Sequence, residues 1–380
     1  LFVQPGECIP NRVGFSKYAS YVNTIYEKKY GYPLVMAMSA DLADSTNLSG
    51  FSKNYDNSHD KGLFDKNNNI DSPLFPQGIT EFTNAGMMAG ATTVNFSNNP
   101  YENFNGFYGA ASTYGSFSYL KYGPLRLFSQ IAQDSNLKVG KFIWVVGHSG
   151  PETAEDSRTH FGIFAPGVTQ LFPNGHIINI HPWEHNEVAP SLSAALQTEV
   201  PIIAIHLTRP AIVIPDRNLM GISSHMDSAK GAYIIRDFEK EGKRKGVVIV
   251  RGTSATNSII QILPKLKDKG INVKIIAAIS WELFIRQDKN YREKVISNYE
   301  WNDAMVVTNG SIKLMNNWIS SLVVKKYSIS PDHDNKWRTG GSVNEIIKES
   351  HLDPDHIFKG IEEFAKDFDK RHLLLNTNKK

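Results

Sequence analysis

The sequence has almost no cysteine, no long hydrophobic run and no excess of one charge. Its 380 residues include one cysteine, Cys8, which excludes an intrachain disulfide and a cysteine-based zinc site and favours a reducing, cytoplasmic location. The longest apolar runs, such as residues 142–146 and 200–205, are strand-sized and fall far short of the roughly 20 residues that span a membrane. Lysine and arginine number 41 against 38 acidic residues, a balance that argues against a nucleic-acid or membrane partner.

The spacing of apolar segments predicts two α/β domains with mainly parallel sheets. Hydrophobic residues make up 41% of the chain, and 380 residues exceed one typical domain. An amphipathic segment at 15–30 predicts a helix, and residues 81–94, dense in glycine and alanine, predict a second one. Strands alternating with helix-length segments are typical of parallel sheets. The expected strands are residues 34–38, 141–146, 176–180, 201–207, 246–250 and 273–279.

A highly charged stretch near residues 236–245 indicates the domain boundary. We expect a first domain at residues 1–220, a linker at 221–240 and a second domain at 241–380, which ends in a helical tail from Val343. Ligands of open parallel sheets bind beyond the carboxyl ends of the strands. Candidate functional side chains should therefore lie in the loops at residues 39–47, 148–160, 181–187 and 208–209.

Several local motifs favour structural interpretations. Gly147 to Pro151 follows a strand as a nucleophile elbow does, but proline stands where that motif needs its last glycine. His181 and His185 have the spacing of a helical metal pair, which Pro182 disfavours. Residues 252–257 lack the glycines and lysine of a phosphate-binding loop, so a capped turn is expected.

Two further features leave a structural and a functional interpretation open. Glu81 opens the small-residue segment, where a carboxylate is favoured at the positive end of a helix. The same glutamate, beside Gly86 and Gly90, is expected to be buried at a packed interface, where it could be functional. The aromatic residues of segment 114–122 are more typical of core than of a ring-binding pocket.

Taken together, the motifs resemble the C-terminal half of a transketolase, a thiamine diphosphate enzyme that transfers two-carbon ketol units between sugars. The resemblance spans nearly the whole chain. His148, Asp156 and His160 reproduce the family's His, Asp and His at the same spacing. The other matching segments are Ser-Ala-Asp-Leu at 39–42, Gly-Ile-Thr-Glu-Phe at 78–82, Thr-Tyr at 113–114 with Phe117, His-Pro at 181–182, Asn-Glu at 186–187, Leu-Thr-Arg at 207–209 and Ser-Trp-Glu-Leu-Phe at 280–284.

The resemblance implies a role for each matching residue. The two-domain α/β fold would be a pyrimidine-binding domain followed by a transketolase C-terminal domain. No metal ligand is assigned in this chain. The implied catalytic residues are Glu81, His160 and His148; those for the cofactor are Glu81, Tyr114, Phe117, Leu120 and Asp41; those for the substrate are His148, Asp156, His160, Arg209, Ser45, Arg12 and Arg158.

Some positions depart from the family's pattern. Ser149 stands where an aspartate is usual, Ser157 and Arg158 replace a Gly-Pro pair, and Leu120 replaces an aromatic residue. Arg158 adds a cation beside the implied substrate channel. The donor or acceptor preference could therefore differ from that of an ordinary transketolase, including an anionic sugar other than a phosphate.

The largest departure is that the family's Gly-Asp-Gly motif followed by Asn, which holds magnesium and the diphosphate, does not occur in the sequence. We therefore expect the N-terminal transketolase half, as a separate subunit or part of a longer polypeptide, to supply that site and its Mg²⁺ or Ca²⁺. A homodimer or heterotetramer is expected, with sugar phosphates as substrates. The alternatives are a deoxyxylulose phosphate synthase-like enzyme, the β chain of a 2-oxo acid dehydrogenase, and a non-enzymatic binding protein.

Overall fold

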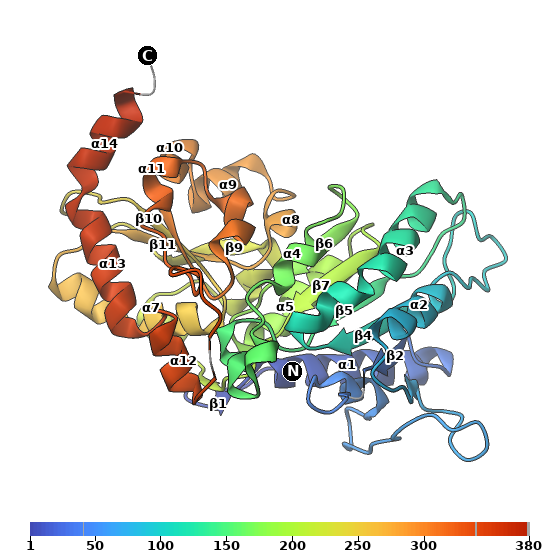
Figure 1. Cartoon of the computed structure of the whole chain (residues 1–380). Coiled ribbons are helices and arrows are strands. Elements are labelled where there is room, and N and C mark those ends of the chain that lie inside the picture. The colour runs from blue at the N-terminus through green and yellow to red at the C-terminus, as the bar shows by residue number, and fades with distance from the viewer. Residues whose placement is uncertain (41, 339, 378–380) are drawn as a thin grey trace.

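The computed structural model describes residues 1–40, 42–338 and 340–377 as two α/β domains that lie side by side (Figure 1). The first domain holds a six-stranded sheet and the second a four-stranded sheet. The first comprises β1 (Cys8–Ile9), α1 (Asn11–Tyr30), β2 (Val35–Ser39), η1 (Leu48–Ser52), β3 (Leu74–Phe75), α2 (Glu81–Ala91), β4 (Tyr108–Thr113), η2 (Gly115–Lys121), α3 (Tyr122–Asp134), β5 (Phe142–Val146), η3 (Pro151–Glu155), η4 (Arg158–His160), α4 (Ala165–Thr169), β6 (Ile177–Ile180), η5 (His185–Glu187), α5 (Val188–Leu196), β7 (Ile202–His206) and β8 (Ile212–Val213).

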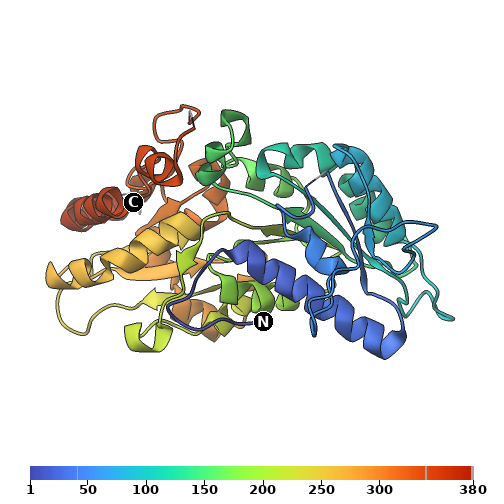
Figure 2. The same ribbon diagram turned by 90° about the horizontal axis from the view of Figure 1, so that it is seen from below.

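The sheet of the first domain is entirely parallel, in the order β3-β2-β4-β5-β7-β6. Alternate residues of each strand face opposite sides, so Ile143 and Val145 of β5 pack with α1 and α5, whereas Trp144 packs with α2 and α3. Figure 2 shows α1 and the α2–α3 pair on opposite sides of the sheet. The result is a three-layer domain in which both faces of the sheet are buried.

The second domain repeats the three-layer plan around a mixed sheet in the order β12-β10-β11-β9. The strands β10, β11 and β12 are parallel, and β9 runs antiparallel to β11. Helices α7 and α13 cover one face, and α8, α9 and η7 the other. The elements are α6 (Arg217–Met220), η6 (His225–Lys230), β9 (Ala232–Arg236), β10 (Val247–Arg251), α7 (Thr253–Asp268), β11 (Lys274–Ala278), α8 (Trp281–Phe284), α9 (Lys289–Val295), α10 (Asn298–Asn302), β12 (Ala304–Thr308), η7 (Ile312–Trp318), α11 (Leu322–Lys325), α12 (Val343–Glu349), α13 (Pro354–Lys366) and α14 (Phe368–Thr377).

These two domains confirm the α/β fold class expected from the sequence. The range predicted as a linker, 221–240, contains β9, which pairs with β11 in the second sheet. The expected helical tail is α12, α13 and α14, which Figure 1 shows on the outer side of the second domain. Among the described residues, no helix combines the length and the apolar character needed to cross a bilayer.

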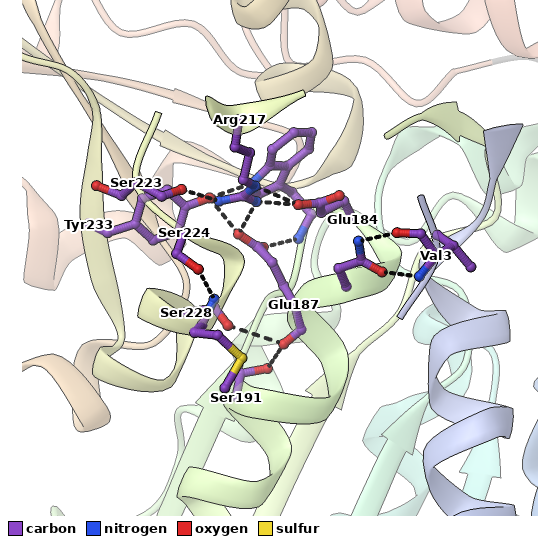
Figure 3. Close-up of polar contacts among 12 residues, drawn as sticks. Val3, Glu184, Glu187, Ser191, Arg217, Ser223, Ser224, Ser228 and Tyr233 are labelled. Carbon is purple, nitrogen blue, oxygen red and sulfur yellow. Dashed lines mark hydrogen bonds and ion pairs between the residues drawn. The ribbon is translucent and has the colours of Figure 1, made fainter. Parts of the chain in front are cut away.

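A buried ion cluster joins the two domains. Arg217, from the segment between the sheets, lies between Glu184 and Glu187 of the first domain and beside Tyr233 of β9 (Figure 3). Its Nε donates to Glu184 Oε1 over 2.8 Å, and its Nη2 donates to Glu187 Oε1 over 2.8 Å. Trp183 completes the cluster by donating its indole N–H to the Tyr233 hydroxyl over 2.7 Å. One guanidinium thus serves two buried carboxyl groups, and burial raises the pKa of Glu184 to about 7.

Candidate functional site

The predicted site residues gather at the carboxyl ends of parallel strands in the first domain. The loops that follow β2, β4, β5 and β7 lie together at the carboxyl ends of these strands, because the four strands run in the same direction. Hydroxyl groups tie the first of these loops to the strand beside it, since Thr46 Oγ1 bonds Ser112 Oγ over 2.8 Å. The loops carry Ser45, Tyr114, Phe117, His148, Asp156, His160 and Arg209.

Glu81 is buried at the first position of α2, as expected. The hydroxyl of Thr113, at the end of β4, donates to Glu81 Oε1 over 3.0 Å. Lys121 is fully buried close by, and its Nζ donates to the carbonyl of Ala111 over 2.9 Å. Burial lowers the pKa of Lys121 well below its usual range, and Glu81 partly opposes that shift. No sequence pattern predicted the burial of this lysine, which lies at the end of a segment of small and aromatic residues.

Aromatic and imidazole rings pack together beside Glu81. The Tyr114 ring lies 4.5 Å from the His148 ring and 5.0 Å from the His160 ring, measured between centroids. Phe117 meets His160 edge to face at 5.4 Å. A side chain at Gly115 would collide with the His148 carbonyl, since an added Cβ would lie 2.5 Å from that oxygen. The glycine therefore allows the loops after β4 and β5 to approach closely.

Arg12 links α1 to the loops after β2 and β5. One nitrogen, Nη1, donates to the Ser45 carbonyl over 2.9 Å and to His148 Nε2 over 2.8 Å. An arginine can only donate, so His148 accepts at Nε2 and carries its proton at Nδ1. Burial, with the charges of Arg12 and Arg209, lowers the pKa of His148 to about 3, which keeps the ring neutral. Ser45 contributes its carbonyl to this contact, whereas its hydroxyl donates to Leu42 over 3.4 Å.

Arg209 and Asp156 form an ion pair on the solvent side of the cluster. Arg209 Nη1 contacts Asp156 Oδ1, and Arg209 Nε lies 3.9 Å from Glu155. The hydrogen bond from Arg209 lowers the pKa of Asp156. Two guanidinium groups, those of Arg12 and Arg209, are near enough that each charge affects the surroundings of His148. Such a pair of cations suits the binding of a phosphate or another anion.

Two of the remaining predicted residues are exposed at the surface. Leu120 is 39% exposed on η2, and Arg158 is exposed on η4, where its guanidinium has no ion pair with any described residue. Asp41 lies outside the described residues. A cavity of about 460 Å³ opens beside Ser45, between the carboxyl ends of β2 and β3.

The loop after β6 contacts the second domain and the N-terminal segment. His181 stacks on His206 with ring centroids 4.1 Å apart, and the backbone N–H of His181 donates to the carbonyl of Ile279 over 2.8 Å. Burial lowers the pKa of both imidazoles, that of His206 to about 3. Asn186 holds the N-terminal segment through two hydrogen bonds with the backbone of Val3. These side chains connect structural elements and do not join the cluster around His148.

The chain thus combines two three-layer α/β domains with a polar cluster at the carboxyl ends of the strands of the first sheet. A family model described as "Transketolase, pyrimidine binding domain" matches residues 27–213, and "Transketolase-like TK C-terminal domain" matches residues 231–331. The chain belongs to the transketolase family, which confirms the resemblance of its motifs. This is a family of transferase enzymes that use thiamine diphosphate.

Similar proteins cover the chain to different extents. Transketolase 7 of Craterostigma plantagineum is 29% identical over 43% of the chain and 23% of its own length, and the transketolase of Nostoc sp. is 30% identical over 50% and 26%. The structure of the Pichia stipitis transketolase in complex with sedoheptulose 7-phosphate matches this chain with 18% identity and a TM-score of 0.70. The match covers 97% of this chain and 48% of the Pichia stipitis chain. A split-gene transketolase described as an inactive β4 tetramer matches 95% of the chain and 99% of its own, with 15% identity and a TM-score of 0.56. The matched part of the chain thus covers about a quarter of the length of the two curated relatives.

Proposed function

We propose that this chain forms half of a two-part transketolase, which transfers a two-carbon ketol unit from a ketose phosphate to an aldose. The observation that carries the proposal is the cluster of Arg12, His148, Asp156, His160 and Arg209 beside a buried glutamate. Paired cations favour an anionic sugar, and the neutral imidazole of His148 can bond to a hydroxyl or phosphate oxygen.

The residues around Glu81 fit the pyrimidine end of thiamine diphosphate. Glu81 offers a buried carboxyl group for a ring nitrogen, and its position is fixed by the hydrogen bond from Thr113. The aromatic faces of Tyr114 and Phe117 lie on the neighbouring loop. When bound, the cofactor supplies the electron sink that carbon–carbon cleavage at a ketose requires.

The chain's own residues would bind and orient the sugar. Glu81 would hold a proton at the pyrimidine N1′. His160 would contact the reacting oxygens of the donor, and Asp156 a hydroxyl group near them. Arg209, with Arg12 and His148, would hold the distal phosphate through charge-assisted hydrogen bonds.

We propose that the N-terminal half supplies the diphosphate and Mg²⁺ or Ca²⁺ site, and that this chain is inactive without it. Exposed apolar residues on α2, α3 and the segment just before α2 support a partner, because Ile79 is 75% exposed, Phe82 61% and Leu127 55%. Phe82 directly follows Glu81, where a partner could complete the cofactor site. A dimer or larger assembly in the cytoplasm is part of the same proposal.

Ketol transfer tests the proposal directly. The chain is combined with its N-terminal half, thiamine diphosphate and magnesium, and xylulose 5-phosphate or fructose 6-phosphate is offered as donor with an aldose acceptor. We expect activity that Glu81→Gln reduces by about 100-fold or more. The control variant Glu102→Gln, on an exposed loop where Glu102 bonds Asn99, should keep full activity. Activity with pyruvate alone, or none with sugars, would overturn the proposal.

A further inference from the structure

The loop of residues 148–160 carries three of the proposed substrate residues and is held by the second domain. Near the middle of this loop, Glu152 is fully buried. The Ser254 hydroxyl, in the first turn of α7, donates to Glu152 Oε1. A residue four positions from both His148 and Asp156 is therefore anchored in the other domain.

Glu152 occupies the place where a sheet of this kind usually binds a ligand. Strand β10 lies between β11, which follows it in the chain, and β12, so the strand order reverses between β10 and β12. Ligands commonly enter the crevice at such a switch point, at the N-terminus of the following helix. Here Glu152 extends to the N-terminus of α7, and Asn309 lies beside Gly150 after β12. A carboxyl group of the first domain therefore lies at the switch point of the second sheet.

Other contacts hold the same loop from its far end. The Ser311 N–H donates to the Ile163 carbonyl over 3.0 Å. The Trp337 ring meets Phe161 edge to face at 5.9 Å and Phe164 at 5.3 Å. Phe161 directly follows His160, so the second domain contacts the chain on both sides of Asp156, at Glu152 and at Phe161.

We propose that Glu152 is a positioning residue, whose hydrogen bond with Ser254 fixes the substrate loop and so sets the places of Asp156 and His160. The inference rests on the proposed function for its effect on catalysis. It gives the C-terminal domain a part in substrate binding, although no residue described in that domain contributes a side chain to the cluster around His148. Displacement of a binding group by even about 1 Å can cost a large factor in rate.

Four variants separate this role from simple packing. Glu152→Leu fills the space without an acceptor, whereas Glu152→Gln keeps an amide oxygen for Ser254. Ser254→Ala removes the donor from the other side with little change in volume. The matched control is Glu199→Gln, which breaks a different contact between the domains, the exposed ion pair of Glu199 with Arg286 at 2.7 Å.

Hydrogen exchange and steady-state kinetics are then compared. We expect the amides of residues 156–162 to exchange about tenfold faster in Glu152→Leu and Ser254→Ala, and the double variant to be no worse than either single one. In the assembled enzyme, KM for xylulose 5-phosphate should rise about tenfold in the same two variants. Glu199→Gln should match the unmodified chain in both measurements, and Glu152→Gln should match it at pH 5, where burial keeps Glu152 protonated.

The results distinguish this inference from the proposed function. Unchanged exchange in Glu152→Leu, or equal changes in Glu199→Gln, would overturn the positioning role. If the assembled, unmodified enzyme transfers no ketol unit, the proposed function fails, whereas the exchange data still decide whether Glu152 fixes the loop. Faster exchange with an unchanged KM would refute the link from the loop to substrate binding.

Discussion

Replacing Arg217 by methionine should destabilise the junction between the domains severely. The guanidinium is buried among Glu184, Glu187 and Tyr233, and it donates to both carboxyl groups. Glu187 would keep hydrogen bonds from the backbone N–H of Trp183 and the hydroxyl of Tyr233. Glu184 would lose the donors to its side chain that the structure shows, since they come from Arg217. Removing one partner of a buried ion pair costs about 3–5 kcal/mol, because the other charge stays buried.

The loss should grow with pH. Burial already raises the pKa of Glu184 to about 7, above the usual value of 4.5, and removing the cation raises it further. A raised folded-state pKa means that folding favours the protonated form, so its stabilising effect is complete below pH 4.5 and is lost as the pH rises through 7. The deficit of Arg217→Met should therefore be larger at pH 8 than at pH 5.

Urea unfolding of the purified chain at pH 5 and pH 8 measures both effects. Arg286→Met is the matched control, because its ion pair with Glu199 also joins the domains but is exposed and worth about 0–1 kcal/mol. The variant Arg217→Met with Glu184→Gln should recover part of the loss at pH 8, since the second change removes a buried charge. A deficit below about 1 kcal/mol at pH 8, or one that is equal at both pH values, would refute the reasoning.

Three more predictions concern groups whose ionisation the fold disfavours. Burial raises the pKa of Glu152 to about 7. The unfolding free energy of Glu152→Gln should therefore equal that of the unmodified chain below pH 4.5 and exceed it by about 3 kcal/mol at pH 8. Equal urea midpoints at pH 8 would contradict this. Burial lowers the pKa of Lys121, so Lys121→Met should melt at a higher temperature at pH 7, with an advantage that shrinks toward pH 10; a lower melting temperature would count against it. The pKa of His148 is lowered to about 3, so its imidazole should stay neutral from pH 5 to 8. Nuclear magnetic resonance can follow this ring, whose signal is the one absent in His148→Gln. Protonation of this imidazole near pH 6 would contradict the lowered pKa.

The sequence predicted the elements whose local pattern is strong. The amphipathic segment at 15–30 is part of α1, and the apolar run at 141–146 forms β5. Strand β4 at Tyr108–Thr113 was not predicted, because its glycine, alanine and serine residues lack an apolar signature. Those small residues are needed for contact with α2: a Cβ at Gly109 would lie 2.5 Å from the Met88 carbonyl. Packing between elements, rather than propensity, determines this strand.

The candidate site shows the same limit. The carboxyl-end rule predicted that His148, His160 and Arg209 lie at the same end of the sheet. Tyr114 follows β4, which was not predicted, so only the family resemblance pointed to its place beside these imidazoles. The burial of Lys121 and the contact of Glu152 with Ser254 depend on neighbours distant in the sequence, so no local pattern announces them. Arg217 likewise falls near an expected domain boundary, where charge suggests exposure, yet it is buried by glutamates about thirty residues earlier.

Calorimetric titration of thiamine diphosphate with magnesium tests whether this chain is the pyrimidine-binding half of a two-part transketolase. The titration is made into the purified chain alone and then into its complex with the N-terminal half. We expect measurable binding only in the complex, and its loss in Glu81→Gln. Tight binding to the chain alone would overturn the two-part assignment, since the diphosphate and metal site would then lie within these 380 residues.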